Sequence, residues 1–349
     1  MRIKTLSLVS AAMLCVTAMP ASAQIAGIDA MKEWNLIVLG DLQSSSEVEG
    51  RTFVGGNLTG NSSNYQIKTP ATSALGTPGL TVVGDVNGGH KNLNNGSGAI
   101  VGGNVNSGFN LNGATQTVKV GGAISNTNVN QNVVQSGLGT SDPAFLVGLN
   151  QQKSVLTTSM GRLSTDMKGL DANSQLTISG NRGTFNAQPD NKGVAVFNIA
   201  AADLDKIGEI QFNLNGADTA IVNVSGTNIN LNDNFLGGTT GLGEHVIWNF
   251  ADATSLKSTT AWGGSVLAPN AAANTGNYIE GSAVFGSLVQ NGEFHLGTYT
   301  GGYTSPVTPP GGGGGPSPIP GETLGLFALG AAGLIGLRWR RKRKEAAAA

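Results

Sequence analysis

The chain has 349 residues, of which 53 are glycine and 12% are charged, and its one cysteine is Cys15. From Gln24 to Gly301 it carries 12 Lys and Arg against 19 Asp and Glu, a net charge of −7, with no cluster of basic residues. Disulfides and cysteine ligands are therefore excluded from this part, and its acidic charge repels a phosphate backbone. We expect no nucleic-acid partner.

The N-terminal segment 1–23 has the features of a secretory signal. Arg2 and Lys4 precede an apolar stretch at 6–16, and the small residues Ala21 and Ala23 form a cleavage site that leaves Gln24 first. The sequence therefore predicts export across the inner membrane, with the Sec machinery and signal peptidase as partners.

A short phrase with glycine at its centre recurs between positions 39 and 124. It occurs at 39–42, 54–58, 83–86, 101–105 and 120–124, and the first glycines stand at positions 40, 55, 84, 102 and 121. The last two steps, near 18–19, are typical of one coil of a parallel β-solenoid, in which glycine or asparagine turns each corner. The long step from 55 to 84 predicts a loop or an irregular coil.

The C-terminal half repeats this theme with strand-like apolar runs. The segments 266–268 and 284–286 are similar, and the step between them falls in the same range. We therefore predict a mainly all-β chain folded as a parallel β-solenoid (β-helix) over residues 24–301. A β-sandwich of ordinary hairpins is the alternative, but a sandwich does not require one phrase at a nearly fixed period.

One segment has helical rather than strand periodicity. Asp142 suits a helix N-cap, Pro143 the first helical position and Gly169 the end, which predicts a helix over 143–168. Its apolar residues form a single stripe, which we expect to cover one flank of the solenoid. The stripe consists of Phe145, Leu149, Leu156, Met160, Leu163 and Met167.

Residues that could carry chemistry are few and scattered. His90, His245 and His295 have no ligand-like spacing, and the sequence contains no nucleotide-binding, zinc-protease or serine-hydrolase motif. We therefore expect no catalytic residue, no cofactor and no metal, and a protein that is not an enzyme.

A β-helix polysaccharide hydrolase or lyase remains the enzymatic alternative, because such enzymes use carboxylate pairs or calcium. The pair Asp203 and Asp205 lies in a turn or short helix that presents both to solvent, and Glu293 could pair with His295 on one strand. A structural calcium would have to use the acidic residues near the first coil, which are Asp41, Glu47 and Glu49.

The C-terminal region is a linker followed by an apolar run. Residues 302–320 are rich in Pro and Gly, and 324–337 form a run that predicts a short transmembrane helix. Six basic residues follow and would stop the helix on the cytoplasmic side, leaving 345–349 as a tail. These six are Arg338, Arg340, Arg341, Lys342, Arg343 and Lys344.

Three segments resemble the choice-of-anchor A family of bacterial surface proteins. They are 34–58, which contains Glu49-Gly50-Arg51, then 245–253, and 262–295, which contains the Leu267–Ala271 turn. The resemblance implies an adhesive β-solenoid with no assigned active site. The last segment is also similar to the final coils of ice-binding-type solenoids, which carry a helix alongside.

Residues 321–344 resemble the PEP-CTERM sorting signal of Gram-negative bacteria. The usual Pro-Glu-Pro is replaced here by Pro320, Gly321 and Glu322. The resemblance implies processing by an exosortase-like enzyme, with transient or permanent membrane anchoring. Together these features predict a surface or extracellular-matrix adhesin that binds an exopolysaccharide or a host or neighbour surface, with a glycan-cleaving β-helix and an ice-binding-type solenoid as alternatives.

Overall fold

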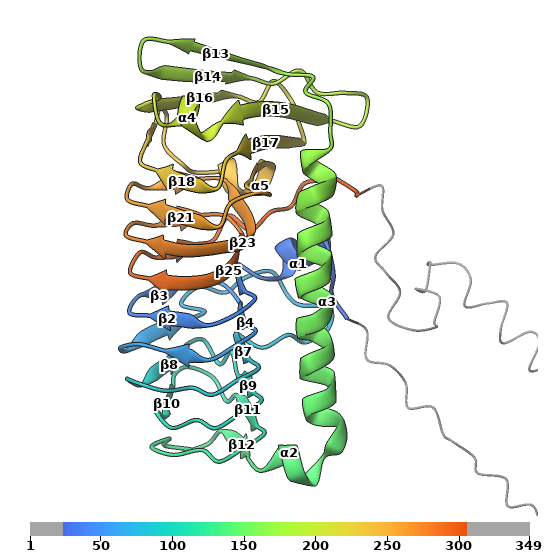
Figure 1. The fold of residues 1–349 in the computed structure, drawn as a ribbon. Coiled ribbons are helices and arrows are strands. Elements are labelled where there is room, and N and C mark those ends of the chain that lie inside the picture. The colour runs from blue at the N-terminus through green and yellow to red at the C-terminus, as the bar shows by residue number, and fades with distance from the viewer. Residues whose placement is uncertain (1–23, 306–349) are drawn as a thin grey trace, which may run out of the picture. The chain divides into compact units, whose positions relative to one another are not determined.

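The computed structural model describes residues 24–305, which form one three-sided stack of coils with a long helix alongside (Figure 1). Two groups of predicted residues lie outside this range. One is the signal with Ala21 and Ala23; the other comprises Pro320, Gly321, Glu322 and the six basic residues from Arg338 to Lys344. Within 24–305 no helix is long and apolar enough to cross a membrane, and the predicted span at 324–337 lies outside these residues.

The first side of the coil, which we call the helix face, is a continuous parallel sheet. In spatial order its strands are β12 (Val133–Gln135), β11 (Thr117–Val120), β9 (Ala99–Val101), β7 (Leu80–Val82), β4 (Thr52–Val54), β1 (Leu36–Val38), β25 (Ala283–Gln290), β23 (Ser265–Thr275), β20 (Val246–Asn249), β17 (Thr219–Ser225) and β15 (Val194–Ala200).

The second side, which we call the β2 face, lies around the corner from the helix face, and β25 and β23 continue from one side to the other. Its strands are β5 (Leu58–Thr59), β2 (Leu42–Ser44), the second halves of β25 and β23, β21 (Ser255–Ser258) and β18 (Asn228–Leu231). Parallel bridges at Val86, Val105 and Ile124 extend it past β5.

The third side consists of two shorter sheets. The first contains β10 (Phe109–Leu111), β8 (Lys91–Leu93), β6 (Ser63–Tyr65), β3 (Glu47–Val48), β26 (Phe294–His295), β24 (Ile279–Glu280) and β22 (Trp262–Gly263). The second contains β19 (Asn234–Phe235), β16 (Glu209–Asn213), β14 (Arg182–Asn186) and β13 (Gln175–Ser179). Every paired strand in the described residues is parallel except β13 with β14, so the solenoid prediction is confirmed and the sandwich is excluded.

The order of the coils in space differs from their order in the chain. The coils that begin with β1 stack outward to β12, and α2 (Leu138–Ser141) and α3 (Pro143–Lys168) follow. Helix α3 then carries the chain to the opposite end, from which the remaining coils stack back until β25 pairs with β1 (Figure 1). We call this pairing of the first and last coils the seam.

The recurring glycine phrase forms the corner between the helix face and the β2 face. One glycine of each phrase stacks on the next, each amide donating to the carbonyl of the previous one, and the stacked residues are Gly40, Gly56, Gly84, Gly103 and Gly122. The corner therefore uses the second glycine of each Gly-Gly pair. As a result, the first three steps between paired residues of neighbouring coils differ by one residue from the steps counted between the first glycines. Separately, the step between β23 and β25 also differs by one residue from the step predicted from 266–268 and 284–286.

Side chains next to these glycines explain why Asp or Asn follows them. The Asp41 carboxylate accepts a hydrogen bond from the backbone amide of Asn57 at 2.7 Å, and the side-chain oxygen of Asn57 accepts one from the backbone amide of Asp85 at 2.9 Å. Asp85 and Asn104 continue the series at 2.6 and 2.9 Å, ending on the amide of Ala123. Each coil thus satisfies a backbone donor of the next coil at a bend where the regular ladder is interrupted.

Helix α3 confirms the predicted helix in its bounds and its role. The Asp142 carboxylate accepts the Ala144 amide at 3.1 Å, Pro143 is the first residue and Gly169 is the C-cap. Figure 1 shows α3 running along the sheet from the β12 end to the β15 end. Its apolar stripe closes a second core between the helix and the helix face, which includes Leu156, Met160, Leu163 and Met167 against Ile37, Phe53, Ile221, Ile247, Leu267 and Val284.

Short elements complete this second core. Helix α1 (Ile28–Glu33) contributes Ala30 and Met31, and the segment that follows β26 contributes Tyr299 and Tyr303. The Tyr299 hydroxyl lies 2.6 Å from that of Thr219 on β17. The chain therefore stays packed to Ser305, into the first residues of the predicted linker. Helices α4 (Ala201–Leu204) and α5 (Leu242–His245) are single turns between strands.

Candidate functional site

The three sides of the coil differ in what covers them. Helices α1 and α3 and the C-terminal segment bury the middle of the helix face. The β2 face has no such cover in the described residues, and its outward side chains are mostly small and polar. Alternation along each strand places Leu42, Leu58, Leu256 and Leu288 in the core and leaves Gln43, Thr59, Lys257 and Val289 outside.

The β2 face is hollowed at the seam. A shallow trough of about 680 Å³ crosses β5, β2, β25, β23 and β21. Its lining comes from two parts of the chain that lie far apart in sequence, one before position 60 and one after position 254. The lining residues are Asp41, Gln43, Asn57, Thr59, Ser255, Leu256, Lys257, Ala272, Ala273, Asn274, Ser287, Leu288 and Val289.

The depth of the trough follows from side-chain size. Ser287 and Ala272 are the outward residues of paired positions on β25 and β23, so the middle of the trough is low. Larger side chains form the next outward row along the strands, where Gln43 on β2 and Lys257 on β21 lie at the two ends, with Val289 and Asn274 between them. These two strands are three strand spacings apart, or about 14 Å. Asp41 and Lys257 place one charge of each sign at opposite ends.

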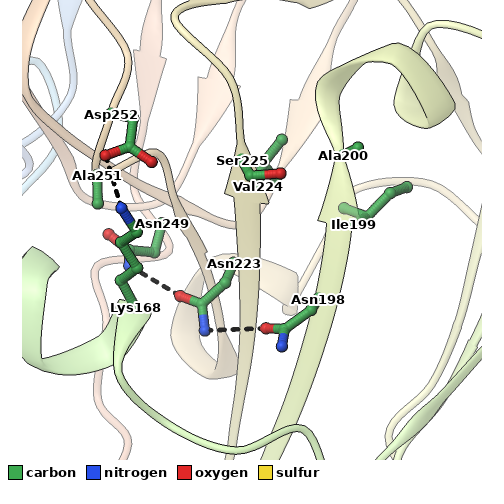
Figure 2. Close-up of a pocket in the computed structure, with 10 residues that line it drawn as sticks. All are labelled: Lys168, Asn198, Ile199, Ala200, Asn223, Val224, Ser225, Asn249, Ala251 and Asp252. Atoms are coloured by element: carbon green, nitrogen blue, oxygen red, sulfur yellow. Dashed lines mark hydrogen bonds and ion pairs between the residues drawn. The ribbon is translucent and has the colours of Figure 1, made fainter.

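A second hollow, of about 340 Å³, lies beside the C-terminal end of α3 (Figure 2). Asn198, Asn223 and Asn249 occupy paired positions on β15, β17 and β20 and form a ladder. Figure 2 shows this ladder running away from the ion pair of Lys168 with Asp252, whose Nζ and Oδ1 are 2.8 Å apart.

The amides of this ladder hold the helix rather than a ligand. The side-chain amide of Asn249 donates to Ser164 O at 2.9 Å and to Asn223 Oδ1 at 2.8 Å. The Ser164 hydroxyl in turn donates to Asn249 Oδ1 at 2.6 Å. The Asn223 amide donates to Met167 O at 2.8 Å and to Asn198 at 3.3 Å. The donors of Asn223 and Asn249 are thus consumed, and they satisfy carbonyls in the last turns of α3. The trough is therefore the better candidate site.

The acidic pair singled out from the sequence lies away from the trough. Asp203 lies in α4 and forms an exposed ion pair with Lys206, with Nζ and Oδ1 2.8 Å apart. Asp205 accepts the Asn230 amide at 3.5 Å. The prediction of a turn or short helix that presents them to solvent is confirmed, with Asp203 in α4 and Asp205 in the turn that follows, and each has a structural partner.

The histidines have separate surroundings. His90 Nε2 lies 3.2 Å from Asn126 O, and His245 Nδ1 lies 2.9 Å from Asp218 O. His295 Nε2 lies 2.8 Å from the Glu293 carboxylate, so the two residues do pair on one strand edge. The ring of His295 also stacks on Tyr278, with centroids 4.3 Å apart, on the third side of the coil.

The acidic residues near the first coil do not converge. Asp41 lies at the corner of the β2 face and binds a backbone amide, whereas Glu47 and Glu49 belong to the third side. Glu49 is committed to Lys68 at 2.7 Å and to the amide of Leu296 at 2.7 Å. No group of three acidic or histidine side chains suited to a metal occurs in residues 24–305.

Two buried charged groups were not anticipated from the sequence. Burial, with the charge of Asp205 as a smaller cause, raises the pKa of Asp233 to about 7. Burial lowers the pKa of Lys91 to about 8, although its ammonium donates to Asn61 O at 2.5 Å. Both lie inside the coil rather than in the trough, and no local sequence signal marks them as buried.

Comparison with known proteins identifies a family. The model of a family described as "Putative Ice-binding-like adhesive domain" matches residues 27–296, which is most of the described part. No curated protein and no solved structure matches the chain.

Proposed function

The chain belongs to this family of ice-binding-like adhesive domains, and we propose that it is an exported adhesin whose trough on the β2 face binds a neutral polysaccharide. The observation that carries the proposal is an open, shallow trough lined by amide and hydroxyl groups from five adjacent strands. Gln43, Asn57 and Asn274 supply both donors and acceptors, as a polyhydroxylated chain requires. With one charge of each sign, the trough has no net charge.

The same residues favour binding over cleavage. Glycosidic hydrolysis usually needs two carboxyl groups facing each other across the substrate. Asp41 is the one carboxylate that lines the trough, while Asp203 and Glu293 are engaged elsewhere with Lys206 and His295. A purified chain that binds a glycan should therefore release no reducing sugar from it.

Ice is the other ligand that the family description suggests, but the residues of the trough do not favour it. A lattice match needs the same side chain repeated at the strand spacing. The outward positions on neighbouring strands are instead Gln43, Val289, Asn274 and Lys257, which differ in size and charge.

The test fills the trough. In the chain that starts at Gln24, Ser287→Trp places an indole on the low middle of the trough, and Ser125→Trp makes the same change on an exposed outer coil. We expect binding to an exopolysaccharide panel to fall at least tenfold in the first variant and to persist in the second. Equal binding by Ser287→Trp would contradict the trough, and inhibition of ice recrystallisation without glycan binding would favour ice.

The C-terminal region completes the proposal. We propose that the choice-of-anchor A resemblance and the PEP-CTERM-like signal describe one design, in which the linker holds the adhesive domain outside a membrane until an exosortase-like enzyme cuts near Pro320, Gly321 and Glu322. Deleting 324–344 should release the domain in soluble form. Mass spectrometry of the mature C-terminus would decide, because recovery of peptides containing Arg338 from surface protein contradicts processing.

A further inference from the structure

We infer that strand β13 pairs with β13 of a second copy, in antiparallel orientation about a two-fold axis, so that the domain forms a symmetric dimer. The inference is independent of the proposed function. It begins from the end of the solenoid that is remote from α2, where Figure 1 shows β13 as the outermost strand.

The other two sides are closed at this end. On the helix face, Asn173 covers the edge of β15. Its backbone amide donates to Val196 O at 3.2 Å, and its side-chain oxygen accepts the Val196 backbone amide at 2.8 Å. Its side-chain amide also donates to Val194 O at 3.0 Å. On the β2 face, α4 packs against β18. In the part of the chain that the structure describes, β13 alone ends its side without a covering element.

The outer edge of β13 exposes backbone N–H and C=O groups that could pair with another strand. Ser179 and Arg182 close a two-residue turn that begins with Gly180 at φ +60°, so they form a hydrogen-bonded pair, as do Thr177 and Thr184. The peptide groups of Leu176 and Ile178 then point away from β14. Within residues 24–305, no backbone group bonds them from outside the hairpin.

The sequence of β13 does not protect this edge. Natural edge strands usually carry a charge, a proline or a bulge that prevents pairing. β13 reads Gln-Leu-Thr-Ile-Ser, has none of these, and pairs with β14 without an irregularity. Ile178 is 43% exposed, which is unusual for a large apolar side chain in a strand.

The sequence of β13 is self-complementary, which identifies the occupant as a second copy. Antiparallel pairing centred on Thr177 places Leu176 opposite Ile178 of the other copy and Gln175 opposite Ser179. Apolar residues then face apolar ones, and polar face polar. The outward peptide groups of Leu176 and Ile178 become the hydrogen-bonded pairs of this register, so each copy uses both outward amides.

The register gives a specific cross-link. Thr177 would lie on the two-fold axis in a non-hydrogen-bonded pair, where Cα atoms are about 4.5 Å apart, within the range that a disulfide spans. Ser179 would lie four positions from its copy along the paired strands, or about 13 Å away. The chain from Gln24 onward has no cysteine, so single cysteines report pairing directly.

The experiment compares Thr177→Cys with Ser179→Cys in the chain from Gln24 to its C-terminus, purified in detergent and oxidised. We expect a disulfide-linked dimer from the first variant on a non-reducing gel and at least tenfold less from the second. Sedimentation of the unmodified chain should show a concentration-dependent doubling of mass that Thr177→Lys abolishes, because the two lysines would oppose each other.

Two results would overturn the inference. One is a monomer at every concentration with no more cross-linking through Thr177→Cys than through Ser179→Cys. The other is an assembly larger than a dimer that survives Thr177→Lys, which would indicate head-to-tail contact between opposite ends of the solenoid rather than a two-fold pair.

Discussion

Replacing Asp233 by Asn should stabilise the protein at neutral and alkaline pH and have little effect in acid. The side chain is fully buried, and neither carboxylate oxygen has a hydrogen-bond partner among the described residues. Burial first, and the charge of Asp205 second, raise the pKa from 3.8 to about 7. The folded state therefore holds this proton more tightly than the unfolded state does.

The sign of the pH dependence follows from this difference. Below pH 3.8 the Asp233 carboxyl is protonated in both the folded and the unfolded state, so burying it does not require burying a charge. As pH rises to about 7 the unfolded state ionises first, so the free energy of unfolding falls across this window and then levels off. At about 1.4 kcal/mol per pKa unit the loss has an upper bound of about 4 kcal/mol. The variant Asp233→Asn would avoid this loss, because an amide does not ionise.

Thermal melting followed by circular dichroism between pH 4 and pH 8 tests this reasoning. At roughly 2 °C per kcal/mol, Asp233→Asn should raise Tm at pH 8 by up to about 8 °C and leave it nearly unchanged at pH 4. Asp85→Asn is a matched control, because Asn57 and Asn104 already serve at equivalent corner positions. Parallel melting curves for Asp233→Asn and the unmodified chain at every pH would refute the buried-carboxyl argument.

Three further predictions concern buried polar groups and close backbone packing. Asn249→Leu should cost about 2–4 kcal/mol in urea denaturation, because Ser164 is left buried and unpaired, whereas Asn198→Leu at the exposed end of the ladder should cost about 0.5 kcal/mol or less. Because burial lowers the pKa of Lys91 to about 8, the free energy of unfolding should rise from about pH 8 to 10.5, and Lys91→Met should abolish this rise. Gly102→Ala should lower Tm, because its Cβ would overlap Val83 O, while Gly148→Ala, which meets open space in α3, should raise it slightly.

The fold was predictable where one residue type has one physical role. Glycine at the corner phrases is required because neighbouring coils approach too closely for a Cβ, and this period led to the solenoid. Asp142, Pro143 and Gly169 marked α3 because capping is a local property of the chain. The register was missed by one position, since in Gly-Gly pairs the sequence does not show which glycine stacks on Gly40 and Gly84.

The candidate site was not predictable because it depends on which coils are neighbours. Gln43 and Lys257 line one trough only because β25 returns to β1 and β2 at the seam. Neither side of the trough has a distinctive motif, since Ser287 and Ala272 matter for being small. Likewise the ladder of Asn198, Asn223 and Asn249 spans three coils whose lengths differ from those of the first half.

The length of α3 explains why the coils stack in an order that differs from their order in the chain. A helix of 26 residues is about 39 Å long, whereas neighbouring coils are only about 4.8 Å apart. A helix packed along the stack therefore passes about eight coils, and the next coil cannot stack on the one before it. It has to begin beyond the first coil, on the side away from β12, and build back toward β1. The seam, and with it the trough, follows from a long helix inserted between two runs of coils.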